Sequence, residues 1–214
     1  MVSIGFLLII NNFIVRKIKF PHRRTLFSLV CDYLRNDMIE LTRITETDCR
    51  EYGFSEKLLT ATFPRDEYRD LTEQRANAAS KQEFHLMLAR YNGEPVGFIS
   101  YWDLGNFCYV EHLATLPAMR SKGHGRAILE RLQEIAPKIV LEVEEPVDDI
   151  TTRRVGFYRR AGFEMCPLPY LQPPYRAGDA PLPMRLMFYG CPADEAHYAR
   201  AKENIYNHIY NYKE

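Results

Sequence analysis

The stretch Arg120-Ser121-Lys122-Gly123-His124-Gly125-Arg126-Ala127 lies between a strand-like segment, 107–115, and an amphipathic segment typical of a helix, 127–135. Glycine lets a backbone turn tightly and approach a ligand without a Cβ in the way. The first N–H groups of a helix are unpaired and carry partial positive charge, and the three basic side chains of this stretch add full charges. The stretch therefore predicts a loop that binds a phosphorylated ligand at a helix N-terminus.

This loop departs from two well-known phosphate-binding sequences. It lacks the Gly-Lys-Ser/Thr ending of a nucleoside-triphosphate P-loop and the three-glycine fingerprint of a dinucleotide fold. Taken alone, it is equally consistent with a basic helix cap. Its meaning therefore depends on the neighbouring sequence.

Two ordered motifs resemble the GNAT N-acetyltransferase superfamily. Segment 109–120, followed by Gly123-His124-Gly125, resembles the cofactor motif of that family: a strand, a short loop often containing proline, and Arg/Gln-x-x-Gly-x-Gly/Ala opening a helix. Segment 157–163, Phe-Tyr-Arg-Arg-Ala-Gly-Phe, resembles the tyrosine-containing helix end and Gly-Phe that follow. The resemblance covers residues 38–188 and implies acetyl transfer from acetyl-coenzyme A, used as a co-substrate, to an amine.

The resemblance also implies roles for individual residues. The backbone of Leu113-Ala114-Thr115 is expected to contact pantetheine and the acetyl carbonyl, and the glycine loop to bind the pyrophosphate. Tyr158 resembles the family's general acid toward the coenzyme A sulfur; the alternative is that it only packs at the helix end. Many relatives carry asparagine seven positions earlier, where this chain has Thr151, which can cap the helix and still form hydrogen bonds. The expected cofactor-binding residues are Leu113, Ala114, Thr115, Arg120, Ser121, Lys122, Gly123, His124, Gly125 and Arg126.

Acidic residues are the candidates for the amine end of the site, because the amine must lose a proton before it attacks. Strand alternation places Glu111 on one face with Tyr109 and Leu113, where it could take that proton directly or through water. Deprotonation through a chain of solvent is the alternative. An acidic group after the next strand would favour a cationic amine, although such runs are more often solvated surface. The group comprises Glu142, Glu144, Glu145, Asp148 and Asp149, with Glu144 as the expected substrate contact.

The order of predicted elements indicates an α/β (α+β) fold. Segment 45–79 predicts two helices with a break near Phe63-Pro64, and Asn92-Gly93 predicts a β-hairpin. The resemblance implies a GNAT-like mixed, mostly antiparallel twisted sheet of six to seven strands, flanked by about four helices. Its central strands, 107–115 and 138–143, are expected to splay apart. Splaying leaves backbone groups unpaired, and the amides of pantetheine can satisfy them.

The remaining segments of the chain precede and follow the region that resembles this family. We expect residues 1–37 to be an appendage, for which a start upstream of the natural one is one explanation, and 38–190 to form the acetyltransferase domain. The alternative for 1–15 is a short membrane-associating anchor, since that segment is apolar but shorter than the roughly 20 residues that span a bilayer. Segment 191–214 predicts a helical extension that docks on its own domain rather than forming a dimer seam. The oligomeric state stays open between monomer and homodimer.

A proline-rich segment, 164–184, precedes that helix. Proline stiffens the chain and the interleaved aromatic residues can pack, which predicts an ordered loop. One interpretation is a loop that covers the substrate, with Tyr175 as a substrate contact. The other is a surface connector.

Composition narrows the function. Of the 214 residues, 28 are basic and 28 acidic, so net charge suggests no bulk attraction to nucleic acid or membrane. Five scattered cysteines form no metal motif and are typical of a reducing cytoplasm. Combined with the family resemblance, which implies the N-acetyltransferase activity, these features lead us to expect a cytoplasmic, metal-free enzyme acting on a primary amine, most simply a small molecule. The alternatives are a non-catalytic acyl-coenzyme A binding module and an acetyltransferase of a protein or aminoacyl-tRNA amine; zero net charge weakens the tRNA version.

Overall fold

The computed structural model describes residues 38–212. The expectations for residues 1–37 fall outside this range and stay predictions. The described residues form one compact unit. Within the described residues, no helix is both long enough and apolar enough to cross a membrane.

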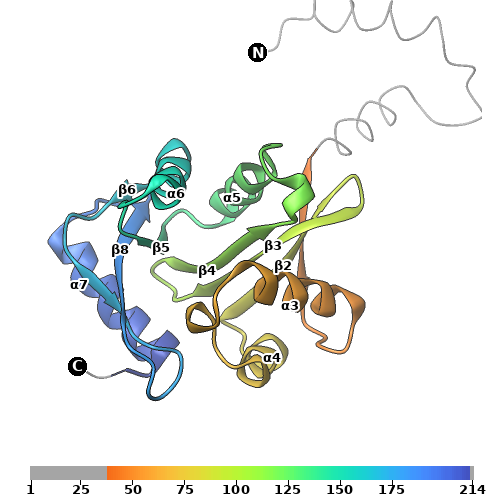
Figure 1. Ribbon diagram of the computed structural model, residues 1–214, viewed down its shortest axis with the longest axis horizontal. Coiled ribbons are helices and arrows are strands. Elements are labelled where there is room, and N and C mark those ends of the chain that lie inside the picture. The colour runs from red at the N-terminus through yellow and green to blue at the C-terminus, as the bar shows by residue number, and fades with distance from the viewer. Residues whose placement is uncertain (1–37, 213–214) are drawn as a thin grey trace, which may run out of the picture. The chain divides into compact units, whose positions relative to one another are not determined.

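An eight-stranded, mostly antiparallel sheet forms the centre of the unit (Figure 1). The strand order is β1-β2-β3-β4-β5-β8-β6, and β7 pairs with β8. Two short strands inside the proline-rich segment, β6 and β7, bring the sheet to one strand beyond the expected six to seven. The strands are β1 (Ile39–Ile44), β2 (Phe84–Tyr91), β3 (Glu94–Asp103), β4 (Cys108–Thr115), β5 (Ile139–Glu144), β6 (Glu164–Met165), β7 (Tyr170–Gln172) and β8 (Leu182–Tyr189).

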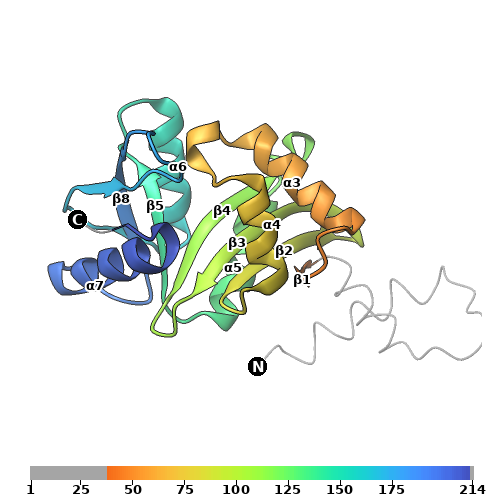
Figure 2. The same ribbon diagram turned by 90° about the horizontal axis from the view of Figure 1, so that it is seen from below.

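Helices cover both faces of the sheet. Helices α3, α4 and α7 lie on one face, and α5 and α6 lie on the other (Figures 1 and 2). Two short 3-10 helices, η1 and η2, lie in the connections, and a π-helix, η3, continues α7. The bounds are α3 (Arg50–Thr62), η1 (Arg65–Glu67), α4 (Leu71–Ser80), η2 (Pro117–Met119), α5 (His124–Ile135), α6 (Asp149–Arg160), α7 (Glu195–Ile205) and η3 (Tyr206–Tyr210).

Local sequence explains where several helices begin and end. Helix α3 ends before Pro64, since the residue before a proline is driven into extended backbone, and Phe63 has ψ 140°. This confirms the predicted break between two helices. Asp148 and Thr151 form a capping box at the start of α6. Gly162 follows α6 with φ 88°, in the left-handed region that glycine adopts without strain.

Each face of the sheet has its own apolar core. The core under α3, α4 and α7 includes buried residues of the C-terminal segment, among them Ala201, Ile205 and Ile209. The core under α5 and α6 includes Leu129 and Val155. The C-terminal helix therefore docks on its own domain, as the sequence predicts.

The two central strands separate after a short common stretch. Strands β4 and β5 pair in parallel only from Cys108 with Ile139 to Val110 with Leu141. Beyond that point β4 continues against β3 as far as Thr115, and β5 continues against β8 as far as Glu144. The expected splayed pair is confirmed, and it opens at the residues that follow Val110 and Leu141.

A β-bulge lies where the strands begin to separate. Ser100 pairs with His112 and Tyr101 with Val110, so Glu111 is an additional residue in β4. Tyr109 packs in the α3-side core, whereas Leu113 packs against the α5-side core. The prediction that Glu111 shares one face with both Tyr109 and Leu113 is wrong, because the bulge interrupts the two-residue alternation.

Candidate active site

A cavity of about 720 Å³ lies where β4 and β5 separate. The end of α3, the start of α5, and parts of η1, η2, α6, β7 and β8 complete its lining. Unpaired main chain, basic residues and carboxylates therefore meet in one space. One end of the cavity is formed by the glycine loop and the other by buried carboxylates.

The glycine loop has the backbone that its sequence predicts. Gly123 is the N-cap of α5, has φ 86°, and leaves the helix start without a side-chain cap. Ser121 also has positive φ, 62°. A Cβ added at Gly125 would lie 3.7 Å from the Phe157 ring and 3.9 Å from Thr115 Cγ2, so this position borders the cavity closely. The uncapped helix start offers free N–H groups to an anion.

Most of the expected cofactor residues line this end of the cavity, while two do not. Ala114 is buried in the core, and the Lys122 ammonium lies 3.7 Å from Met119 Sδ, outside the lining. Arg126 forms an exposed ion pair with Glu130 at 2.7 Å. The members that line the cavity are Leu113, Thr115, Arg120, Ser121, Gly123, His124, Gly125 and Arg126.

Tyr158 lines the cavity from α6. Its ring packs edge-on against Phe157 and Phe163, with centroids 5.0 and 5.7 Å away. Burial raises the pKa of its phenol to about 12, with a smaller opposing effect of the Arg154 charge. Among the described residues, no hydrogen-bond partner is recorded for its hydroxyl. The Tyr158 proton is therefore firmly held at neutral pH and available to a ligand.

Glu111 lies at the other end of the cavity and is fully occupied by protein donors. Its buried carboxylate forms an ion pair with Arg69, accepts from Trp102 Nε1 at 3.1 Å, and accepts from the Tyr175 hydroxyl at 2.9 Å. Burial opposes the charge, but Arg69 outweighs it, and the pKa of Glu111 lies below its usual value. Arg69 itself is 1% exposed and lies over the rings of Trp102 and Tyr175.

Glu142 lies at the same end, on β5, in a different environment. Its carboxylate accepts from the hydroxyls of Tyr170 (2.5 Å) and Tyr210 (3.0 Å) and from Gln172 Nε2 (2.5 Å). All three donors are neutral, and no ion pair is recorded for Glu142 within residues 38–212. Burial raises the pKa of its carboxyl to about 7, against the opposing effect of the hydrogen bonds.

The two expected substrate residues lie in different places. Glu144 lines the cavity and forms an ion pair with Arg154. Tyr175 lies behind Glu111, outside the lining, and its hydroxyl is 3.4 Å from that of Tyr210. Glu67 of η1 also lines the cavity, and its pKa is raised by burial and by the charge of Glu144.

Sequence reasoning missed Arg69, Gln172 and Tyr210. None belongs to a recognisable motif: Arg69 follows a helix break, Gln172 lies in the proline-rich segment, and Tyr210 lies near the chain end. Only their contacts in the fold reveal them. Within the described part of the chain, no cluster of His, Cys, Asp or Glu could hold a metal ion.

Comparison with known proteins agrees with this geometry. The profile of the "Acetyltransferase (GNAT) family" matches residues 39–163. A solved structure assigned to the GNAT acetyltransferase family, from Bacteroides thetaiotaomicron, is 41% identical, with a TM-score of 0.78 over 81% of this chain and 99% of that chain. A search of curated proteins gave no match.

More distant structures share the fold. A ribosomal-protein alanine N-acetyltransferase from Escherichia coli is 18% identical, with a TM-score of 0.52 over 71% of this chain and 93% of that chain. A spermidine N-acetyltransferase chimera that includes the Vibrio cholerae enzyme is 14% identical, with a TM-score of 0.53 over 72% and 95%. Fold, cavity and family profile agree, and the chain belongs to the GNAT acetyltransferase family.

Proposed function

We propose that the protein is an enzyme that transfers the acetyl group of acetyl-coenzyme A to the primary amine of a small molecule. The observation that carries this proposal is the cavity between the splayed strands, with an anion-binding loop at one end and buried carboxylates at the other. Membership of the acetyltransferase family supports the acyl-transfer chemistry. The reaction needs both ends, because the acyl donor and the amine must meet in one enclosed space.

The cofactor end fits coenzyme A in its chemistry. The β4 segment 111–115 has no strand partner on its β5 side, which leaves main-chain groups for the amides of a pantetheine arm. The start of α5 and Arg120 offer donors for phosphate oxygens. When bound, acetyl-coenzyme A supplies an activated acetyl group as a thioester. A cofactor in this place would lie beside Tyr158.

Tyr158 is our proposed proton donor. Tyr158 lines the cavity, and its hydroxyl has no recorded partner in the described part of the chain, so its proton is free to move to the sulfur as the thiolate leaves. The pKa of about 12 keeps that proton on Oη throughout the neutral range. The group therefore acts as an acid and does not serve as a base.

Glu142 is our proposed proton acceptor for the amine, in preference to the sequence-based candidate Glu111. The pKa of Glu111 is depressed by Arg69, and three donors occupy its carboxylate, which makes it a weak base. The pKa of Glu142 is about 7, which suits a group that must take a proton at neutral pH. In this proposal Glu111 holds Arg69 and Tyr175 in position.

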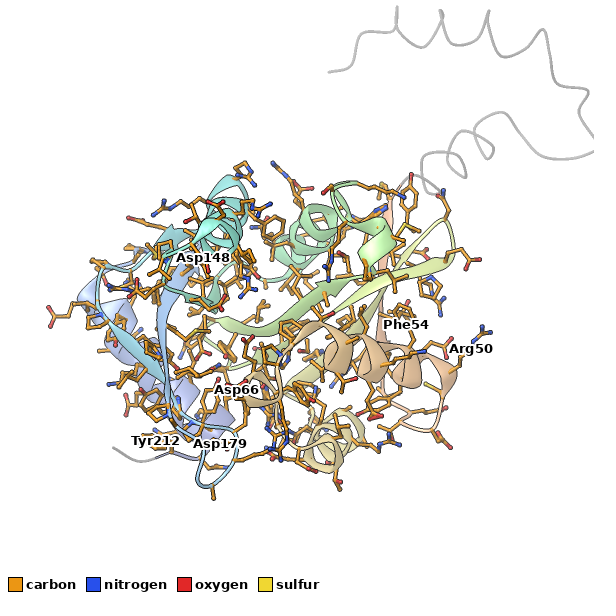
Figure 3. The ribbon with its side chains drawn as sticks, viewed as in Figure 1. Arg50, Phe54, Asp66, Asp148, Asp179 and Tyr212 are labelled. Carbon is orange, nitrogen blue, oxygen red and sulfur yellow. The ribbon has the colours of Figure 1, made fainter. Side chains whose placement is uncertain are left out.

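A loop held beside the carboxylate end, where the Tyr175 hydroxyl donates to Glu111, supports a small acceptor. This loop, 173–181, contacts the α3–α4 connection through Arg176, which donates to Arg65 O and lies 5.5 Å from the centre of the Tyr68 ring. It also contacts the C-terminal segment through Tyr175 and Tyr210, whose ring centroids are 5.0 Å apart. In Figure 3, Asp179 of the loop and Tyr212 lie at the same end of the molecule. A loop fixed in this way restricts the space beside Glu111, which favours a small acceptor over a polypeptide.

Release of coenzyme A in the presence of a panel of primary amines tests the proposal, with mass spectrometry to identify the acetylated product. We expect release to depend on the amine and a product that is 42 Da heavier than its acceptor, about the mass an acetyl group adds in place of hydrogen. Calorimetry with acetyl-coenzyme A provides the parallel binding measurement. Binding without turnover of any amine would contradict the enzyme and favour an acyl-coenzyme A binding module.

A further inference from the structure

The side-chain oxygen of Gln172 is a buried acceptor without a donor. Gln172 lies on β7, is 5% exposed, and borders the cavity. Its amide nitrogen donates to Glu142 Oε2 at 2.5 Å and to the Tyr210 hydroxyl at 2.8 Å. Its Oε1 has no hydrogen-bond partner among residues 38–212. A buried acceptor left in this way is costly, and a ligand in the cavity is a source of the missing donor.

The hydrogen bonds of Tyr210 determine which atom of the Gln172 side-chain amide, the nitrogen or the oxygen, remains without a partner. The single proton of the Tyr210 hydroxyl is shared between Glu142 and the Tyr175 hydroxyl, so toward Gln172 this hydroxyl can only accept. A carboxylate and an accepting hydroxyl both require the amide nitrogen on their side. The oxygen must then point away from both groups. A π-helix, a form often found at functional sites, brings Tyr210 to this position.

Glu142 lacks the cationic partner that Glu111 and Glu144 have. Among the carboxylates lining the cavity, Glu111 pairs with Arg69 and Glu144 pairs with Arg154, whereas Glu67, like Glu142, has no ion pair recorded within residues 38–212. The described residues provide Glu142 with neutral donors only. Burying a carboxylate without a cation is unfavourable, which agrees with the raised pKa of this group. A positively charged ligand would supply both the missing charge and the missing N–H.

We propose that Glu142 and Gln172, held in place by Tyr210, form the binding site for the acceptor and select an amine that arrives protonated. The ammonium donates one N–H to Gln172 Oε1 and pairs with the Glu142 carboxylate. One proton then moves from the nitrogen to Glu142, which leaves a neutral amine with its lone pair free. This inference rests on the proposed function and specifies its substrate class: alkylamines, which are protonated near neutral pH as lysine is, rather than neutral arylamines.

Two isomeric amines test the charge preference directly. Benzylamine and 4-methylaniline have the same atoms, but at pH 7.5 only the alkylamine is protonated. Together with n-butylamine and 1,4-diaminobutane, they serve as probes for coenzyme A release by the wild-type protein. We expect kcat/KM for the alkylamines to exceed that for 4-methylaniline by at least about 100-fold, since a buried charge pair is lost with the neutral amine. A kcat/KM for 4-methylaniline equal to or greater than that for the alkylamines would contradict the proposed binding site.

Variants test the residues. In Gln172→Leu, KM for the alkylamine should rise by about 10- to 100-fold, the effect of losing a hydrogen bond to a charged group. KM for acetyl-coenzyme A should stay within about twofold. Gln82→Leu removes an exposed glutamine outside the cavity and should match the wild type. An unchanged amine KM in a folded Gln172→Leu protein would refute the role.

Tyr210→Phe provides a second test that keeps the ring in place. It frees the Gln172 amide to turn, so the amine KM should rise by about 3- to 10-fold, again without a change for acetyl-coenzyme A. If Gln172→Leu fails to fold, this variant and the isomer comparison decide the inference. Failure of the proposed function has a separate signature: acetyl-coenzyme A binds, but the wild type releases no coenzyme A with any amine.

Discussion

The two ends of the cavity are built in different ways. The cofactor end is largely one continuous stretch, from Leu113 at the end of β4 to Arg126 in the first turn of α5. The carboxylate end is assembled from separate elements, and its hydrogen-bonded pair Glu142 and Tyr210 is 68 positions apart in the chain. Phosphates can be bound by the backbone of one turn, whereas a buried polar network needs side chains from many elements.

The two ends also differ in charge and enclosure. Arg120 is exposed at the cofactor end, while the Glu111 side chain is fully buried at the other. We therefore expect changes at the first end to alter binding of acetyl-coenzyme A. Changes at the second end should alter the use of the amine and its pH dependence.

The largest effect is expected at the glycines. Gly123→Val places a β-branched residue at φ 86°, and Gly125→Val fills the cavity beside Phe157, so either should abolish binding of acetyl-coenzyme A in calorimetric titration. Gly93→Val is a matched control, because Gly93 has φ 81° and open surroundings in the β2–β3 turn. It imposes similar backbone strain away from the cavity and should leave the affinity intact. Unchanged affinity in both loop variants would refute the cofactor end.

Tyr158→Phe should separate chemistry from binding. It keeps the ring contacts with Phe157 and Phe163 and removes only the proton that we assign to the leaving sulfur. Turnover should fall by about 10²-fold or more, with little change in amine KM. Thermal stability should be unchanged, because none of the described residues is recorded as a hydrogen-bond partner of the hydroxyl. Wild-type turnover would show that the sulfur leaves without this acid.

Glu142→Gln should remove a pH dependence as well as activity. The raised pKa of Glu142 means that the carboxyl is protonated below about pH 7 and cannot accept the proton of the amine. Wild-type kcat/KM for the amine should therefore fall as pH drops through about 7. The variant should lose about 10²-fold in rate and lose this inflection. Glu144→Gln is the comparison: its charge is paired with Arg154, so the inflection should remain. An inflection that persists in Glu142→Gln would assign it to another group.

Arg120→Ala should have a smaller effect, confined to the cofactor. Loss of a charge-assisted contact to phosphate would weaken acetyl-coenzyme A by about 1.5–3 kcal/mol. Calorimetry measures this loss, and raising the salt concentration should shrink the difference between variant and wild type. A salt-independent loss would point to packing in place of charge.

The sequence predicted the cofactor end because its signals are local. The two glycines, the strand before them and the helix after them are contiguous, and Tyr158 follows in a second motif of the same kind. The splayed strand pair came with the family resemblance to those motifs. Each of these features is encoded within a short window.

The other end could not be predicted in the same way. The bulge at Glu111 depends on pairing with β3, so alternation within β4 alone wrongly placed Leu113 on the same face as Glu111. Strand β7 is three residues long, too short for any periodic pattern to indicate it, and it carries Gln172. Tyr210 joins the network through a π-helix at the far end of the chain. Tertiary packing, which no local window contains, brings these residues together.

Steady-state KM values for both substrates, in Arg120→Ala and Gln172→Leu, test the division of the cavity most directly. The two-ended site predicts a crossed pattern. Arg120→Ala should raise KM for acetyl-coenzyme A and leave that for an alkylamine unchanged, while Gln172→Leu should do the reverse. If both variants raise the same KM, the cavity does not hold the acyl donor and the amine at its separate ends.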